Sequence, residues 1–189
     1  MSGHGHRFNP DKASKLLDPK RKQIIAPEMV MELFELRRSD VVADLGAGNG
    51  YFTVPLAINT DQTVYAVDIE PKMLHFLQEH ARMKNVKNIK YVESNLESIP
   101  INDGEVDKIL IAFVIHEVPD RQKVYNELKR IKKQEGKIVL VEWQAVESEM
   151  GPSLKERIPS EELQKELKKN DFQVEVTELN NQVYAISIQ

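Results

Sequence analysis

Three glycines and an acidic residue stand together where an apolar segment of the sequence ends. Gly46, Gly48 and Gly50 follow residues 41–45, and Asp44 precedes the first glycine by two positions. Glycines at this spacing let the backbone approach a ligand closely, and a helix that begins after them presents unpaired N–H groups to an anion. Either a nucleotide diphosphate or a carboxylate suits such a loop. The Asp44 carboxylate favours an amino acid, because it can hold a positively charged ammonium group beside the loop.

A second acidic residue, Asp68, ends the next strand-like segment, where a carboxylate can accept both hydroxyls of a ribose. Other nucleotide loops fit the sequence poorly. Tyr51 occupies the position where the G-x-G-x-x-G loop of NAD-dependent oxidoreductases needs its third glycine, and no Gly-Lys-Ser/Thr follows as in a Walker loop. An amino-acid site beside a nucleoside site describes S-adenosylmethionine. We therefore predict that the chain binds this cofactor.

Strand-like and helix-like segments alternate along the sequence, and these segments must position the residues named above. Short runs rich in valine and isoleucine predict strands, and segments with helical periodicity lie between them, which favours a parallel sheet with helical crossovers. We expect strands at residues 41–45, 63–67, 89–92, 106–113 and 137–143, and helices at residues 51–58, 72–83, 121–133 and 161–169. Pro71 suits the first turn of its helix, and Asp120 can cap the next one. Residues 172–177 and 182–188 flank Asn180 and Asn181, a pair that tolerates positive φ, and predict an antiparallel hairpin.

Four parts of the sequence carry a resemblance to a known family: residues 44–50, Asp68, residues 93–100 and residues 113–120. They resemble successive motifs of class I S-adenosylmethionine-dependent methyltransferases. The stretch His-Glu-Val-Pro-Asp at 116–120 is similar to that of small stand-alone methyltransferases related to the ubiquinone/menaquinone biosynthesis group. The resemblance implies an α/β, Rossmann-like, seven-stranded, mainly parallel sheet with helices on both faces and an antiparallel C-terminal hairpin strand. It also implies S-adenosylmethionine as methyl donor and S-adenosylhomocysteine as product.

The resemblance implies which residues hold the cofactor. Those expected in and after the glycine loop, and at the end of the fourth strand, are Asp44, Gly46, Ala47, Gly48, Gly50, Tyr51, Phe52, Ala112 and Phe113. Those expected around the nucleoside are Asp68 on the ribose, Ile69 against the adenine, and Asn95 and Leu96 at the adenine edge. Many relatives have aspartate where this chain has Asn95. The Asn95 amide oxygen is therefore expected to accept the hydrogen bond from the adenine amino group.

Two residues at strand ends are candidates for a general base: His116 follows the fourth strand, and Glu142 lies near the end of the fifth. Methyl transfer from a sulfonium is an in-line displacement that depends mostly on alignment and on the exclusion of water. A base is needed only where the acceptor is a weakly acidic hydroxyl or carbon acid. The alternative for His116 is a packing or capping role near the following helix. We expect no metal site.

The composition limits the partners. The 26 basic and 30 acidic residues give a net charge of −4, which disfavours nucleic acid as a substrate. The chain has no cysteine, and no apolar run approaches the roughly 20 residues that span a bilayer. We expect a small-molecule acceptor, no membrane insertion, a cytoplasmic location, and a monomer or a homodimer. A methyltransferase that acts on protein or RNA, and a cofactor-binding module without catalysis, remain as alternatives.

One methyltransferase domain is expected over residues 1–189, because the composition does not change along the chain. Residues 1–38 are expected to form an N-terminal arm and helical cover, and residues 39–189 the cofactor-binding α/β core. Walls of the acceptor pocket are expected from residues 6–10 and 150–157, since specificity in such folds comes from additions above the sheet. The basic residues Lys129, Arg130, Lys132 and Lys133 are expected to form a solvated face.

Overall fold

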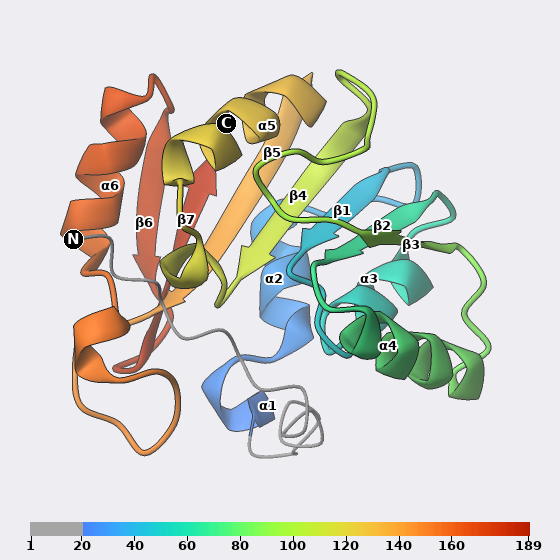
Figure 1. Ribbon diagram of the computed structural model, residues 1–189, viewed down its shortest axis with the longest axis horizontal. Coiled ribbons are helices and arrows are strands. Elements are labelled where there is room, and N and C mark those ends of the chain that lie inside the picture. Colours follow the sequence, from blue (N-terminus) through green and yellow to red (C-terminus); the bar gives the residue numbers. More distant parts are fainter. Residues whose placement is uncertain (1–20) are drawn as a thin grey trace.

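Short runs of valine, isoleucine and leucine form the strands of one sheet (Figure 1). The computed structural model describes residues 21–189, and within this range seven strands pair in the order β3-β2-β1-β4-β5-β7-β6. The strands are β1 (Val42–Leu45), β2 (Val64–Asp68), β3 (Ile89–Glu93), β4 (Val106–Ala112), β5 (Lys132–Trp143), β6 (Val174–Glu178) and β7 (Val183–Ile188). The pairs of β7 with β5 and with β6 are antiparallel, and the other pairs are parallel. The predicted mainly parallel sheet with an antiparallel C-terminal hairpin is confirmed.

Helices cover both faces of the sheet (Figure 1). The apolar sides of α5 (Arg121–Ile131) and α6 (Ser160–Lys169) pack on one face, and those of α2 (Pro27–Phe34) and α3 (Thr53–Asn59) pack on the other. The helix α4 (Pro71–Met83) contacts α3 and β2 and so joins the second group. Three shorter helical segments are α1 (Arg21–Ile24), η2 (Ile115–Glu117) and η3 (Leu154–Glu156).

Alternate residues of the central strands divide the core into two layers. Ala43 and Ile109 belong to the layer with α5 and α6, whereas Val42 and Leu110 belong to the layer with α2 and α3. All four side chains are fully buried. Strands that are covered on both faces need a largely apolar sequence, which is the pattern of residues 41–45 and 109–113. This double burial fixes the strand ends that carry the site.

Single residues set the starts of α4 and α5. Pro71 occupies the first turn of α4, and the Glu70 side chain accepts a hydrogen bond from the Lys72 N–H. Asp120 caps α5 because its side chain accepts a hydrogen bond from the Lys123 N–H. The roles predicted for Pro71 and Asp120 are confirmed.

The helical cover predicted before the first strand is divided into two helices. The helix α1 ends at Ile24, and α2 begins at Pro27, which cannot donate a main-chain hydrogen bond to a preceding turn. Glu35 ends α2 with a left-handed φ of 54°. The first 20 residues of the predicted arm, including the pocket wall expected at residues 6–10, lie outside the described range.

Two predictions of local structure are wrong in detail. The helix expected to reach residue 133 ends at Ile131, and β5 begins at Lys132 instead of residue 137. Val106 of β4 pairs with Lys132, so main-chain pairing extends the strand through a polar stretch. In the turn between β6 and β7, neither Asn180 nor Asn181 has a positive φ. The Asn180 side-chain oxygen instead accepts hydrogen bonds from the N–H groups two and three residues later.

The carboxyl ends of β1, β2, β4 and β5 meet at one edge of the sheet, and the strand order reverses between β1 and β4. In open parallel sheets, ligands bind in the crevice beside such a reversal. The loops that follow these strands therefore form the place where a site is expected.

Candidate active site

The glycine loop is held between the ends of β2 and β4. The Gly46 N–H donates to the Val67 carbonyl at 2.8 Å, and the Gly48 N–H donates to Asp68 Oδ2 at 2.7 Å. Gly46 has a φ of 82°, and a Cβ atom at this position would lie 2.3 Å from Cγ2 of Val114. The loop is therefore shaped by the protein's own contacts, and glycine is required at position 46.

Asp44 and Gly50 lie outside the wall of the cavity described below. Asp44 is buried at the end of β1, where Thr53 Oγ1 donates to its Oδ2 at 2.6 Å. Gly50 packs against α4, because a Cβ atom on it would lie 2.8 Å from Cγ of Leu77. The contact with α4 accounts for glycine at position 50, and the cofactor contacts of these two residues stay predictions.

Tyr51 and Phe52 precede α3, although residues 51–58 were expected to form the helix. The Tyr51 hydroxyl donates to the Ile25 carbonyl at 2.7 Å. This bond ties the link between α1 and α2 to the glycine loop. The rings of Tyr51 and Phe52 pack edge to face with their centroids 4.9 Å apart.

A cavity of about 910 Å³ lies at this edge of the sheet. Ligand cavities commonly measure roughly 300–1,000 Å³, so this one has room for a cofactor and a small acceptor together. Most of the residues predicted for the site line it: Gly46, Ala47, Gly48, Tyr51, Phe52, Asp68, Ile69, Asn95, Leu96, Ala112, Phe113 and His116. The loops after β1, β2 and β3 form one end of the cavity, which we call the cofactor end. The loops after β4 and β5 form the other, the acceptor end.

Asp68 and Ile69 offer a polar and an apolar surface side by side. Asp68 Oδ1 accepts from the Glu70 N–H at 2.9 Å, and its Oδ2 accepts from the Gly48 N–H. Burial raises the pKa of Asp68, and these two hydrogen bonds partly oppose the effect. A carboxylate has about four lone-pair positions, so it can also accept hydroxyl donors such as those of a ribose. Ile69 is 42% exposed and provides a surface on which a flat ring can lie.

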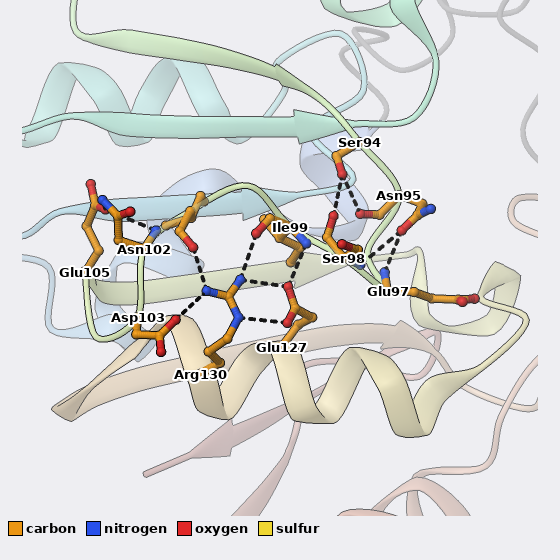
Figure 2. A network of polar contacts seen from close by, with 11 residues as sticks. Ser94, Asn95, Glu97, Ser98, Ile99, Asn102, Asp103, Glu105, Glu127 and Arg130 are labelled. Carbon is orange, nitrogen blue, oxygen red and sulfur yellow. Dashed lines mark hydrogen bonds and ion pairs between the residues drawn. The ribbon is translucent and has the colours of Figure 1, made fainter.

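The Asn95 amide oxygen is used within its own loop (Figure 2). It accepts hydrogen bonds from the Glu97 N–H at 3.0 Å and from the Ser98 N–H at 3.1 Å. The sequence assigned this oxygen to the adenine amino group, and the structure gives it two main-chain partners instead. The amide nitrogen is the polar atom of Asn95 that remains for a ligand, and it is a donor.

Arg130 fastens the adenine-side loop, residues 94–105, to α5 (Figure 2). Its guanidinium donates to the carbonyls of Ile99 and Ile101 at 2.7 Å each. It also pairs with Glu127, whose Oε2 accepts from the Ile99 N–H at 2.6 Å. The hydrogen bonds that Arg130 donates to Glu127 and Asp103 raise its pKa, and it therefore stays charged. The solvated face predicted for this residue is wrong, because Arg130 is directed into the loop.

Phe113 and Trp143 form an aromatic wall at the acceptor end. Their ring centroids lie 4.8 Å apart. Phe113 has a left-handed φ of 61°, a conformation that costs a residue with a side chain about 1–3 kcal/mol and that occurs preferentially at functional sites. Gly151 lies on the Trp143 ring, since a Cβ atom on it would be 2.8 Å from Cδ2 of the indole. This close approach holds the 144–152 loop over the ring.

Arg157 holds the 144–152 loop through a set of hydrogen bonds. Its guanidinium donates to Ser148 Oγ at 2.8 Å and to main-chain carbonyls of four residues of the loop: Gln144, Val146, Met150 and Pro152. Burial lowers the pKa of Arg157, and the charge of Glu142 opposes this. The predicted wall at residues 150–157 is represented at the cavity by Met150, Gly151, Pro152 and Glu156.

His116 and Glu142 form one hydrogen-bonded pair. His116 Nδ1 lies 2.8 Å from Glu142 Oε1, and Glu142 Oε2 accepts from the Trp143 N–H at 3.1 Å. Glu142 is fully buried and does not line the cavity, whereas His116 does. Burial lowers the pKa of His116, but the hydrogen bond and charge of Glu142, with smaller contributions from Glu117 and Glu156, raise it above its ordinary value.

A family model described as a methyltransferase domain matches residues 36–187. The chain belongs to this methyltransferase family. The match extends from the residues before the glycine loop to the C-terminal hairpin. Together with the solved relatives, it confirms the resemblance to class I S-adenosylmethionine-dependent methyltransferases.

Individual relatives of this methyltransferase agree with the family match. A crystal structure of a SAM-dependent methyltransferase from Aquifex aeolicus has a TM-score of 0.91 and 29% identity, covering 96% of this chain and 98% of that chain. The demethylmenaquinone methyltransferase of Geobacillus sp. (strain WCH70) is 27% identical over 65% of this chain and 53% of its own length. The ubiquinone/menaquinone biosynthesis C-methyltransferase UbiE of Marinomonas sp. (strain MWYL1) is 30% identical over 61% of this chain and 47% of its own length. The chain spans about half the length of these two curated relatives.

The candidate site also depends on residues that the sequence motifs do not reveal. Arg130 and Arg157 donate to main-chain oxygens, and Thr53 donates to the carboxylate of Asp44, nine residues earlier. Trp143 is marked only by its place at the end of a strand. Within residues 21–189, no group of three or more His, Asp or Glu residues could hold a metal ion. No helix in this range has the length and apolar character needed to cross a membrane.

Proposed function

We propose that this chain transfers a methyl group from S-adenosylmethionine to a small-molecule acceptor. The main support is the cavity of about 910 Å³. One end of it, at Asp68 and Ile69, is suited to bind a nucleoside, and the other end has an aromatic wall formed by Phe113 and Trp143. The cofactor supplies a methyl group bonded to a positively charged sulfur. The role of the protein is then to align the two reactants and to exclude water.

The cofactor end fits S-adenosylmethionine in both charge and shape. Asp68 can accept hydrogen bonds from the ribose hydroxyls, and Ile69 offers the apolar surface for the adenine ring. Asn95 can donate from its amide nitrogen to a ring nitrogen of the base. The Asp44 carboxylate, behind the glycine loop, adds negative charge near the methionyl ammonium group.

The acceptor end suits a small molecule with a flat ring. Phe113 and Trp143 offer aromatic surface, and Met150 adds a polarizable side chain that adapts to different shapes. Two curated relatives carry names that refer to quinones, which supports an aromatic acceptor here. A protein or RNA substrate is less favoured, because the net charge is −4 and the site is a cavity rather than a groove.

Calorimetric titration with S-adenosylmethionine, S-adenosylhomocysteine and NAD tests the proposal. The wild type should bind the first two at micromolar concentrations and should not bind NAD. Asp68→Ala should lose at least about tenfold in affinity, because the charge-assisted bonds to the ribose are lost. Asp61→Ala is the matched control, since Asp61 is exposed and pairs with Arg38 away from the cavity.

The outcomes separate the alternatives. Absence of binding by the wild type would refute the cofactor site. Binding with turnover on peptides or RNA, and none on small aromatic acceptors, would favour the macromolecular substrate. Binding without turnover on any of them would favour the module without catalysis.

A further inference from the structure

The hydrogen-bonded pair of His116 and Glu142 has the arrangement of an oriented base. Both Glu142 carboxylate oxygens are engaged, one by His116 Nδ1 and the other by the Trp143 N–H. Glu142 is fully buried, so it does not reach a ligand in the cavity. Within residues 21–189, the cavity-lining side chain that Glu142 contacts is the imidazole ring of His116, whereas its contact with Trp143 is through the main-chain N–H. Glu142 thus acts through His116.

The partner of Nδ1 determines which nitrogen of His116 can take up a proton. A carboxylate only accepts hydrogen bonds, so the neutral ring carries its proton on Nδ1 and has its lone pair on Nε2. Nε2 lies 3.8 Å from Glu117 Oε1, which is beyond hydrogen-bond distance. The ring lines the cavity, and Nε2 is the nitrogen that is not engaged by Glu142.

His116 lies in the loop after β4, at the acceptor end of the cavity. It belongs to η2, which begins two residues after the left-handed Phe113. Val114, in between, contacts the glycine loop, where a Cβ atom on Gly46 would lie 2.3 Å from its Cγ2. His116 therefore follows closely in the chain both Phe113 of the aromatic wall and Val114, which contacts the glycine loop.

We propose that His116 is the general base of the methyl transfer, that Glu142 positions it, and that the acceptor carries a weakly acidic O–H or C–H group. This inference rests on the proposed function. In the step, an electron pair of the acceptor oxygen or carbon forms the bond to the methyl carbon. The methyl–sulfur bond breaks with its electron pair going to sulfur, which becomes neutral. The acceptor proton moves to His116 Nε2.

The need for a base separates classes of acceptor. A neutral amine attacks through a lone pair that it already has, whereas a phenol, a hydroquinone or a carbon acid becomes a good nucleophile as its proton leaves. A buried carboxylate that orients an imidazole serves the second class, as in other base-assisted nucleophilic sites. The pair and the aromatic wall together point to phenolic or hydroquinone-like acceptors.

The charges around the pair predict the direction of the pH dependence. The groups that act on His116 or on Glu142 come from several elements: Glu117 from η2, Glu142 from β5, Glu156 from η3, and Arg157 and Tyr184 beside Glu142. For His116 the carboxylates outweigh burial, and its pKa is raised. Only the neutral ring accepts a proton, so the rate of transfer should increase as the pH rises through this pKa.

Three variants test the pair: His116→Gln, Glu142→Gln, and His75→Gln as the control on the exposed face of α4. Calorimetry with S-adenosylhomocysteine comes first, and all three should bind as the wild type does, within about twofold. Failure of the wild type to bind would refute the proposed function itself. Normal binding by the variants assigns any later defect to the chemical step.

A nuclear magnetic resonance titration of the imidazole signals provides a readout that does not need turnover. His116 is assigned by the signal missing in His116→Gln, and its pKa should lie above the ordinary value for a histidine. In Glu142→Gln the pKa of His116 should fall, because burial then acts without the charge of Glu142. A pKa of His116 that does not exceed the ordinary value for a histidine, or that does not fall in Glu142→Gln, overturns the proposal.

Turnover is measured with catechol, hydroquinone and benzylamine as probe acceptors. The phenolic probes should be methylated, and His116→Gln should reduce kcat by about 10²–10⁴-fold, while His75→Gln leaves it unchanged. Glu142→Gln should move the acidic limb of the pH profile to lower pH. Wild-type rates in His116→Gln, or methylation of benzylamine with none of the phenols, overturn the inference. If no probe turns over, the titration of His116 decides alone.

Discussion

Replacing Gly46 by alanine should destabilise the folded chain by about 2–5 kcal/mol through two separable effects. The left-handed φ of 82° costs a residue with a Cβ atom about 1–2 kcal/mol. The new Cβ would also lie 2.3 Å from Cγ2 and 3.1 Å from Cβ of Val114, and such overpacking costs about 1–3 kcal/mol. Valine is short and β-branched, so its side chain cannot turn both contacts away.

Urea unfolding of a double-mutant cycle separates these effects. The free energy of unfolding is measured for the wild type, Gly46→Ala, Val114→Ala and the double variant. In the Val114→Ala background the change at Gly46 should cost only the backbone part, which leaves a coupling of about 1–3 kcal/mol between the two positions. Gly104→Ala is the control for the backbone part alone, because Gly104 has a φ of 61° and a Cβ atom on it would meet nothing within 4 Å.

Two results would refute this reasoning. Equal costs of Gly46→Ala with valine and with alanine at position 114 would mean that the Val114 contact does not select glycine. A cost no greater than that of Gly104→Ala would mean that the close approach of the two loops is relieved without strain.

Three further predictions concern the cofactor end and the base. Arg130→Met should loosen residues 94–105 and weaken S-adenosylhomocysteine binding in calorimetry by roughly three- to tenfold, which corresponds to the free energy of about one hydrogen bond. The control Lys129→Met should leave this affinity unchanged. Asn95→Asp should keep the hydrogen bonds within the loop and add a hydrogen-bond acceptor for the adenine amino group. The preference of the variant for S-adenosylhomocysteine over S-inosylhomocysteine should therefore rise by roughly three- to tenfold. An unchanged preference would mean that residue 95 does not contact the base. The pKa of His116 is raised above 6.5 in the folded state, so its stabilising effect is fully present below that pH and is lost as the pH rises through the folded-state pKa. The unfolding free energy of the wild type should therefore exceed that of His116→Gln by more at about pH 5 than at about pH 9, and the opposite order would contradict the sign of the shift.

The sheet could be predicted because its signals are local. Successive residues such as Val42 and Ala43 lie in different buried layers, and a continuous apolar run is the direct mark of a strand covered on both faces. The start of β5 could not be predicted, because Lys132 joins the sheet through main-chain pairing with Val106. Such pairing does not require apolar side chains, so the sequence at this point shows no strand pattern. The turn at Asn180 was predicted as a hairpin, but its geometry comes from a side-chain oxygen rather than from positive φ.

The candidate site could be predicted at the level of residues but not of partners. Asp68, Asn95 and His116 all line one cavity, as their motif positions indicate. That His116 binds Glu142, and that the Asn95 oxygen turns back onto its own loop, depends on distances across the fold. The domain boundaries, the cytoplasmic location and the oligomeric state stay predictions.

The way in which Arg157 holds the 144–152 loop has a consequence for how far the sequence of this loop can be changed. Four of its five partner residues offer a carbonyl oxygen, a group that every amino acid carries. Side chains along the loop can therefore be exchanged without loss of the frame that supports them. A library that varies Val146, Glu149 and Met150 while Arg157 is retained should yield folded proteins with altered acceptor ranges, and the same library with Arg157 replaced should yield few.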